Sequence, residues 1–332
     1  MRVSAIVGTR NRAHAIADCL SSIAAALAKA APLDAEIIVV DNGSTDRTSV
    51  VIQNWAASCA FPVRLLFEPR PGLSAARNYA MRVAKGGLLV FTDDDCRLSK
   101  DYINDLLRRD AADNDLVLRG GRVELGDPTD LTLSIKTSPD LMRWHRRMNS
   151  AKYENLAATI VGCNMALRRE VAERIGPFDE RFGPGASVPA SEDTDWIYRA
   201  YLANITIEYV PDMVIYHHHG RKRQSEGDKL CANYAIGNGG LYAKYLFKDP
   251  NLCRTFVRDV KISIGRFLSG RRNYFVIGNF GCYRHVWLAY CVLGAVKFLF
   301  LVVTGGMKNS FVRPDRKGAS LGKRALKNTD PG

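Results

Sequence analysis

Residues 88–96 read LLVFTDDDC, and this stretch decides the fold of the chain. Its apolar first half is typical of a buried strand, which stops at three consecutive aspartates, Asp93, Asp94 and Asp95. Side chains alternate faces along a strand, so Asp93 and Asp95 are expected to point the same way. Paired carboxylates at this edge indicate a divalent metal site for a phosphorylated ligand, because open α/β sheets bind ligands there. An acidic, solvated turn is the alternative that the triplet alone leaves open.

Strand and helix patterns alternate at short intervals over the first 125 residues. Ser44 and Ser74 are predicted to cap two of the helices. This alternation predicts an α/β fold with a mostly parallel central sheet and helices on both faces, and ligand residues in the loops after the strands. The predicted strands are residues 3–7, 36–40, 63–67 and 88–92.

The second half of the chain is less regular. Residues 126–155 are polar and contain prolines, which indicates either a lid or acceptor loop or a plain surface insertion. We expect a first domain over residues 1–220 and a helical C-terminal extension over 221–332. Further strands are predicted within 157–167 and at 206–209 and 214–216, and helices at 192–203, 228–247 and 252–268.

Composition and charge indicate a folded protein and limit its expected binding partners. Of 332 residues, 47% are hydrophobic and 24% charged, which is typical of a folded protein. The net charge of +13 implies attraction to anions, but no motif of a nucleic-acid-binding module is present, so nucleic acid is not an expected partner. The eight cysteines form no CxxC pair, and the first residues lead straight into a strand without a secretory signal. Both features predict a cytoplasmic location.

Residues 286–303 are apolar except for Lys297, close to the lower length limit of a membrane span. The preceding domain and the basic tail both favour the cytosolic side, which argues against a single complete span. The segment is therefore expected to be a re-entrant, interfacial or core helix. We expect a peripheral protein at the inner face of the cell membrane, with the tail against anionic lipid.

Six stretches together resemble family 2 glycosyltransferases of the GT-A fold. They are VSAIVGTRNR, VVDNGSTDRT, PGLSAARNYAMRVAKGGLLVFTDDDC, GCNMALRREVAERIGPFDERF, SEDTDW and VPDMVIYHHH, between residues 3 and 219. The resemblance implies inverting hexosyl transfer from a UDP-, GDP- or dTDP-sugar to an acceptor hydroxyl with Mg or Mn. It also implies a role in polysaccharide or glycoconjugate synthesis, on a glycan or lipid-linked acceptor.

The resemblance also implies roles for individual residues. Asp41 is expected to bind the nucleotide base, Arg77 and Asn78 the ribose or phosphate, and Asp93, Asp95 and His217 the metal. The alternatives are a turn aspartate at position 41 and a solvated helix face at 77 and 78. The full donor set is Thr9, Asn11, Arg12, Asp41, Arg77, Asn78, Asp93 and Asp94.

Asp193 matches the general base of the family, and Gly162, Asn164 and Glu192 match its acceptor side. A carboxylate suits this task because burial by the acceptor raises its pKa. The alternative for Glu192 and Asp193 is favourable interaction with a helix N-terminus. His218 and His219 are expected to face solvent.

Two departures from the family pattern concern the first loop and the metal site. Gly8 stands where a proline is common, and Cys96 stands where some members carry a further aspartate. Two rival functions remain: a catalytically silent nucleotide-sugar scaffold and a sugar nucleotidyltransferase. A nucleotidyltransferase would be expected to have a glycine-rich triphosphate loop near residue 10, and the sequence has none there.

Overall fold

A computed structural model describes residues 2–146, 159–246, 248–269, 274–277 and 280–305. Four parallel strands form the first half of its central sheet, in the order β3-β2-β1-β4. They are β1 (Val3–Thr9), β2 (Ala35–Asp41), β3 (Val63–Phe67) and β4 (Leu88–Asp93). All four strands predicted in this region are confirmed. The helices between them are α1 (Ile16–Lys29), α2 (Thr48–Ala56) and α3 (Leu73–Val83).

The second half of the sheet is mixed in direction. From β4 the order continues β8-β6-β9-β5, with β7 paired to β9, and the β6–β9 pair is parallel whereas the other pairs here are antiparallel. The strands are β5 (Cys96–Leu98), β6 (Val117–Leu125), β7 (Met142–Trp144), β8 (Asn164–Arg168) and β9 (Thr206–His217). The helices of this half are α4 (Tyr102–Ala111), α6 (Arg169–Ile175) and α7 (Glu192–Leu202).

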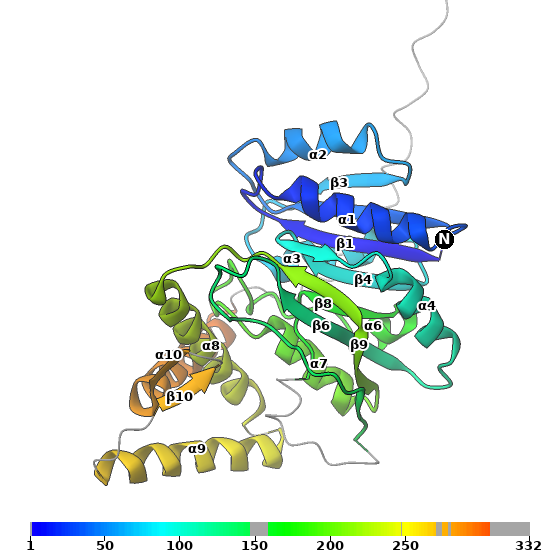
Figure 1. The fold of residues 1–332 in the computed structure, drawn as a ribbon. Helices are drawn as coiled ribbons and strands as arrows, with labels where there is room; N and C mark the ends of the chain where they lie inside the picture. Colours follow the sequence, from blue (N-terminus) through cyan, green and yellow to red (C-terminus); the bar gives the residue numbers. More distant parts are fainter. Residues whose placement is uncertain (1, 147–158, 247, 270–273, 278–279, 306–332) are drawn as a thin grey trace, which may run out of the picture.

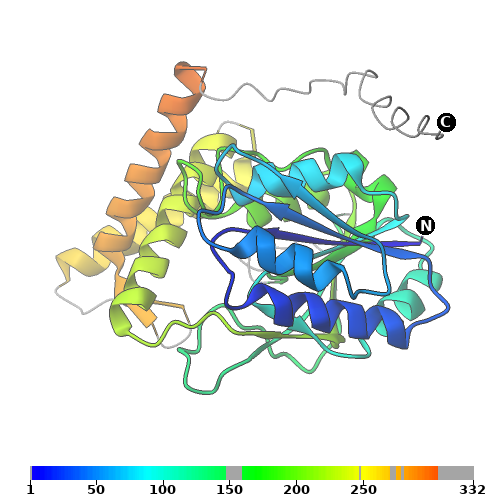
Figure 2. The same ribbon diagram turned by 90° about the horizontal axis from the view of Figure 1, so that it is seen from above.

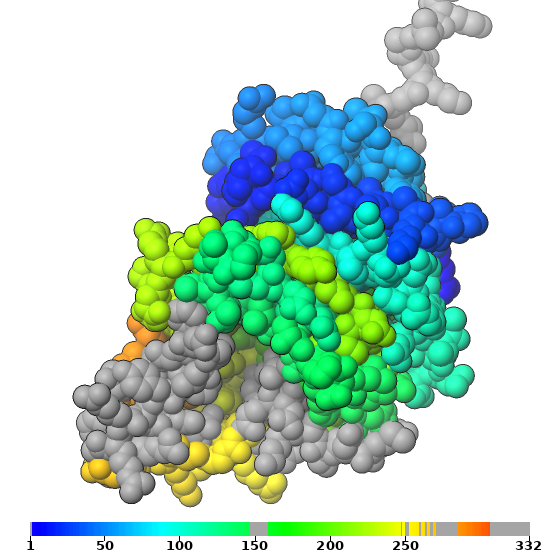
Figure 3. Space-filling view, viewed as in Figure 1, coloured from blue at the N-terminus to red at the C-terminus, as the bar shows by residue number. Residues whose placement is uncertain are grey.

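Helices cover both faces of the sheet, as predicted (Figure 1). Buried side chains of β2 alternate between the two faces. Ile37 and Val39 pack on the face covered by α1 and α4. Ile38 and Val40 pack on the face covered by α3, α6 and α7. The α/β fold is thus confirmed, with its parallel part confined to the first strands. Figure 3, a space-filling view, shows α1 and α2 at the upper edge and α9 at the lower edge of the molecule.

Several predicted details differ from the structure. Residues 206–209 and 214–216 belong to one strand, β9, and the region expected to be irregular contains β7; residues 147–158 lie outside the described part. Neither predicted serine cap is formed. Ser44 Oγ instead accepts a hydrogen bond from the backbone N–H of Asn11 at 2.9 Å, and Ser74 lies inside α3 and donates to the carbonyl of Phe182 at 2.8 Å.

The C-terminal extension packs onto the same core as the sheet. Its elements are α8 (Gln224–Tyr245), α9 (Pro250–Leu268), β10 (Tyr274–Ile277), β11 (Phe280–Tyr283) and α10 (Arg284–Val303). The small hairpin β10–β11 was not predicted. Ile236, Tyr242 and Trp287 belong to one hydrophobic cluster with Phe182 and Trp196 of the first 220 residues. The proposed division at residue 220 therefore crosses a shared core.

Candidate functional site

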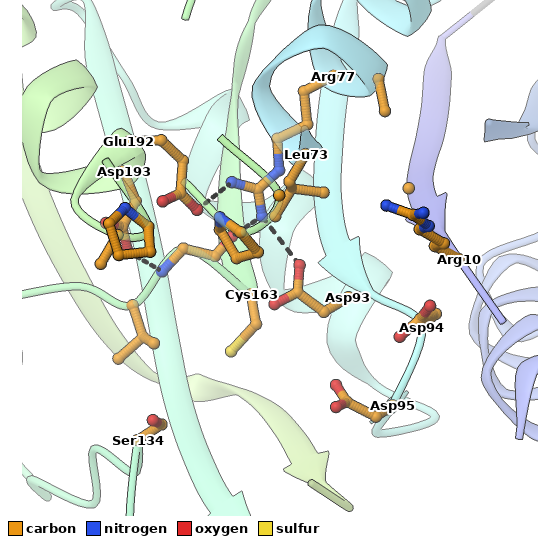
Figure 4. Close-up of a pocket in the computed structure, with 18 of the residues that line it drawn as sticks. Arg10, Leu73, Arg77, Asp93, Asp94, Asp95, Ser134, Cys163, Glu192 and Asp193 are labelled. Atoms are coloured by element: carbon orange, nitrogen blue, oxygen red, sulfur yellow. Dashed lines mark hydrogen bonds and ion pairs between the residues drawn. The ribbon is translucent and has the colours of Figure 1, made fainter. Parts of the chain in front are cut away.

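A cavity of about 520 Å³ opens at the carboxyl edge of the parallel strands. Asp93 lines it from the end of β4, Asp95 from the turn that follows, and Asp193 from the first turn of α7 (Figure 4). His217 lines it from the end of β9. Acidic groups far apart in the sequence thus meet around one space. This is the arrangement that the sequence predicts at this edge of the sheet.

The aspartate triplet is arranged differently from the expected continuous strand. β4 ends at Asp93, and Asp94 and Asp95 form a turn before β5, so strand alternation does not set their directions. Arginines compensate the three charges. Arg77 pairs with Asp93 at 2.9 Å, and Arg12 pairs with Asp94 at 3.2 Å and with Asp95 at 3.1 Å.

Burial and neighbouring charge separate the pKa values of these acids. Burial raises the pKa of Asp94 to about 6, against the opposing charge of Arg12. Burial also acts to raise the pKa of Asp95, but the hydrogen bond and charge of His217 outweigh it and hold that pKa at about 2. His217 responds in the opposite sense: burial lowers its pKa, yet Asp95, 3.4 Å from Nε2, raises it to about 9. Without a bound cation, Asp95 and His217 therefore form an ion pair, and a cation ligated by His217 would displace the proton that the two residues share.

Part of the predicted metal site is assembled. Single ligand atoms of Asp95, Cys96 and His217 lie within 4.8 Å of one another. A carboxylate and an imidazole suit Mn²⁺, whereas burial raises the pKa of the Cys96 thiol and keeps it a weak, neutral donor. Asp93, the third predicted ligand, is held by Arg77 and is not part of this cluster. The donor set fits a divalent cation at Asp95 and His217.

Arg77 is predicted to contact the ribose or phosphate of the donor, but its side chain is more deeply buried than such a contact requires. Its side chain is 2% exposed and contacts Asp93 and, at 3.4 Å, Glu192 (Figure 4). It also donates to the carbonyl of Gly162 at 3.0 Å. Each of these three partners lines the cavity. Arg77 is thus a buried cation between the aspartate triplet and the start of α7.

Asp193 is held at the cavity wall by backbone donors. Its Oδ2 accepts the N–H of Gly162 at 3.0 Å, and its Oδ1 accepts the N–H of Thr194 at 2.7 Å. A Cβ at position 162 would lie 2.6 Å from Oδ2, so only glycine permits this approach. Glu192 beside it is buried, and burial raises its pKa well above the usual range.

Three residues predicted to bind the donor, Asn11, Asp41 and Asn78, are not among those that line the cavity. Asn11 is exposed, and its Oδ1 accepts the N–H of Thr45 at 2.7 Å. Asp41 is buried and accepts hydrogen bonds from Ser44 and Ser49, which is the turn role left open from the sequence. Thr9 and Arg12 do line the cavity, as do Arg77, Asp93 and Asp94.

Asn78 and Asn164 make hydrogen bonds within the protein and do not line the cavity, so their predicted roles in binding stay predictions. Asn78 Nδ2 donates to the carbonyl of Phe178 at 2.9 Å, away from the cavity. Asn164 Oδ1 accepts from the Tyr102 hydroxyl at 2.7 Å, and its Nδ2 donates to the carbonyl of Met213 at 3.0 Å. Gly162 and Glu192, the other two acceptor-side residues, line the cavity.

The expectation that His218 and His219 face solvent is wrong for His219. Its side chain is buried, its Nδ1 accepts the N–H of Arg221 at 3.0 Å, and its Nε2 lies 2.9 Å from the carbonyl of Leu131. Because His217 and His219 share one side of the chain, their rings meet edge to face with centroids 5.2 Å apart. His218 is partly buried.

Helix α8 supplies a wall of the cavity that the sequence analysis missed. Leu230, Asn233 and Tyr234 are spaced three and four residues apart and share one helix face. The Tyr234 hydroxyl lies 2.8 Å from that of Ser134, which ties α8 to the loop after β6. The helical spacing of polar and aromatic side chains beyond residue 220 was the available signal. Arg221 also lines the cavity.

Comparisons with known proteins agree with this architecture. The profile of Glycosyl transferase family 2 matches residues 4–176. Glycosyltransferase AglE of Haloferax volcanii is 25% identical over 79% of this chain and 80% of its own length. The succinoglycan biosynthesis protein ExoM of Rhizobium meliloti is 27% identical over 53% of this chain. That match covers about half (54%) of the length of ExoM.

A solved structure shares the fold. The mannosyltransferase PcManGT of Pyrobaculum calidifontis, in complex with GDP-Man and Mn²⁺, aligns with 90% of this chain and 87% of its own at 20% identity and a TM-score of 0.54. The family match covers the aspartate triplet and Gly162, and the structural match covers 90% of the chain. The chain therefore belongs to glycosyl transferase family 2 and is a nucleotide-sugar-dependent glycosyltransferase with the GT-A fold.

Proposed function

We propose that the chain is an inverting, metal-dependent glycosyltransferase in which Asp193 is the general base. The observation that carries this proposal is the common cavity of Asp93, Asp95 and Asp193. Inversion requires a base on the side of the anomeric carbon opposite to the leaving diphosphate. Figure 4 shows Asp193 across the cavity from Asp94, which supports these opposite roles.

Asp193 has the geometry that a base needs. Each of its oxygens accepts a backbone hydrogen bond, and a carboxylate has roughly four lone-pair sites, so it can still accept the proton of an acceptor hydroxyl. The N–H groups of Gly162 and Thr194 fix its orientation. Arg77 and Glu192, which lie 3.4 Å apart, line the cavity next to Asp193.

Asp95 and His217 are the residues proposed to hold the cation. A divalent metal bound there would neutralise negative charge on the departing nucleoside diphosphate. Arg12 and Arg221 also line the cavity and add positive charge for the phosphates. The complex of PcManGT with GDP-Man and Mn²⁺ supports a nucleotide sugar and Mn²⁺ as the pair of ligands.

The acceptor is proposed to be a glycan or a lipid-linked glycan in polysaccharide or glycoconjugate synthesis. The name of ExoM, a succinoglycan biosynthesis protein, supports this class. The proposed location is the cytoplasm, which agrees with seven free cysteines among the described residues. Leu230, Asn233 and Tyr234 of α8 are then proposed to contact the acceptor, because they line the cavity with Asp193.

Two substitutions test this assignment. Asp193→Asn should lower kcat by at least about 100-fold, because the base is lost, while Mn²⁺-dependent binding of the nucleotide sugar stays within about twofold. Asp95→Ala should weaken that binding itself. The matched control is Glu173→Gln, an exposed carboxylate on α6 outside this cavity, which should behave as the wild type.

Donor binding by calorimetry and transfer from a panel of nucleotide sugars give the two readouts. Normal turnover by Asp193→Asn would disprove the assignment of the base. Wild-type protein that binds donor and Mn²⁺ yet transfers no sugar to any acceptor would instead be a silent scaffold.

A further inference from the structure

The outer face of α10 is apolar and exposed. Val292, Val296, Leu299 and Val303 follow one another at helical spacing and are 51–84% exposed, with Phe300 beside them at 66%. The opposite face is buried against α8. By length and composition, residues His285–Val303 could cross a membrane. Figure 2 shows α10 on the outer side of α8, away from α1 and α2.

Backbone contact with α8 fixes the position of α10. A Cβ at Gly239 of α8 would lie 1.8 Å from the carbonyl oxygen of Cys291, and a Cβ at Gly294 of α10 would lie 1.9 Å from that of Ile236. Only glycines allow two helices to approach this closely. α10 is therefore part of the α8 layer and cannot leave it without opening a packed interface.

α8 in turn is fixed to the catalytic half. Lys244 Nζ lies 2.8 Å from Asp179 and 2.6 Å from Asp195, and the Tyr245 hydroxyl donates to Asp195 at 2.7 Å. The same helix lines the catalytic cavity with Tyr234. Because α10 packs along this helix, α10 can immerse its outer face in lipid only while its inner face stays against α8, which argues against a complete span of the bilayer.

The charges near this face fit an anionic surface. Lys297 is exposed within the apolar stripe of α10, and Lys261 lies between the exposed Val257 and Ile264 on α9, which packs against α10. Residues 306–332, which follow α10 directly, carry seven lysines and arginines and two aspartates. Apolar residues bordered by basic ones are typical of helices that lie in the plane of an anionic membrane.

We propose that α10 lies in the plane of an anionic phospholipid bilayer and docks the enzyme there through Val292, Val296, Leu299, Phe300 and Val303. Because α8 carries α10 on one face and lines the cavity with another, docking holds the cavity next to the lipid surface. A lipid-linked acceptor would then reach Asp193 from the membrane. This last step rests on the proposed function, whereas docking itself does not.

Vesicle flotation of the purified full chain tests the docking. The wild type should float with vesicles of phosphatidylcholine mixed with phosphatidylglycerol and bind vesicles of phosphatidylcholine alone more weakly. The double variant Val296→Asp and Phe300→Ser should reduce the bound fraction by about tenfold or more, since two immersed apolar side chains are lost. The matched control Val50→Asp changes an exposed valine (42%) on α2 and should bind as the wild type.

Hydrogen exchange of the unmodified chain gives a second measurement, in which the vesicles should protect residues 292–303. Wild-type protein that does not float, or a double variant that floats equally well, would overturn the proposal. A wild-type dimer that the double variant converts to a monomer, without vesicle binding, would assign this face to a second copy. Resistance to alkaline carbonate extraction would mean that α10 spans the bilayer. Asp193→Asn should still float, which separates docking from catalysis.

Discussion

Arg77 is the cation that joins the two halves of the site. It touches Asp93 on the side proposed for the donor, and Gly162 and Glu192 on the side of the proposed base. A buried arginine with satisfied carboxylate partners contributes less than its Coulomb energy suggests, but removal of the arginine leaves the carboxylates uncompensated. Arg77 is therefore a positioning residue in this structure.

Replacement of Arg77 tests that role. Arg77→Met should lower the free energy of unfolding by about 3 kcal/mol, because Asp93 loses its charged partner and Glu192 and the carbonyl of Gly162 lose a hydrogen-bond donor. Arg77→Lys keeps a charge but not the planar fork, so its loss should be smaller. Urea unfolding measures both. A methionine variant as stable as the wild type would show that the ion pairs are unimportant.

Gly162 controls the position of Asp193. Gly162→Ala would place a Cβ 2.6 Å from Oδ2 of Asp193, so the carboxylate must move. A displacement of this kind should reduce kcat by about 100-fold while donor binding is unchanged. Gly87→Ala is the control, since its Cβ would meet nothing nearer than 3.9 Å. Equal turnover of both variants would contradict the role of Gly162.

For individual residues, the sequence predicted the position of those at strand and helix ends better than that of residues whose hydrogen-bond partners are remote in sequence. Asp93, Asp95 and Asp193 share the cavity because a parallel sheet collects such ends at one edge. Asn78 and Asn164 turned inward, because the carbonyls of Phe178 and Met213, remote in sequence, take their amides. No local pattern encodes those partners.

Among the elements, the strands of the parallel half were predictable and the short ones were not. Buried parallel strands are continuous apolar runs, so β1 and β4 stand out in the sequence. β7 has three residues and is only partly buried, and the two strands of the hairpin β10–β11 have four residues each. Strands of that length carry too few residues for a period of two to be recognised.

The contact of α8 with the loop before α7 predicts an acid dependence of stability. Burial acts to raise the pKa of Asp179, but Arg181 and Lys244 outweigh it and hold that pKa well below its usual range. The folded state thus favours the ionised form. This contribution is complete above the unfolded pKa of about 3.9 and is lost as the pH falls through the lower, folded pKa.

Asp179→Asn should therefore reduce the slope of unfolding free energy against pH below about pH 5. Urea unfolding between about pH 3 and pH 7 measures it. Asp140→Asn, an exposed aspartate, is the control and should keep the wild-type slope. Equal slopes for Asp179→Asn and the wild type would mean that this carboxylate does not couple α8 stability to pH.

For the whole molecule, the shared core decides whether residues 1–220 form an independent domain. Buried side chains of α8 and α10, such as Tyr242, Trp287 and Phe298, pack with Phe182 and Trp196. A chain that ends at residue 220 would expose this part of the core. The family profile ends earlier still, at residue 176, before Asp193.

We accordingly expect a chain ending at residue 220 to aggregate or to unfold without cooperativity, whereas a chain ending at Gly305 should unfold as the full protein does. Size-exclusion chromatography and calorimetry distinguish these outcomes. Cooperative unfolding of a monomeric 1–220 fragment would establish the predicted division instead.

One face of α8 lines the cavity and another packs in the core. Leu230 and Asn233 are half-buried at the cavity, whereas Ala235, Ile236 and Leu241 complete the core. Leu230 also packs against Leu133 and Cys231, whereas Asn233 belongs to no hydrophobic cluster, so Asn233 can be changed with little loss of stability. If α8 contacts the acceptor as proposed, such a change would alter which hydroxyl is accepted. Descendants of this chain could thus diversify their glycan products through a few substitutions on one helix, with the sheet and its charged cluster left intact.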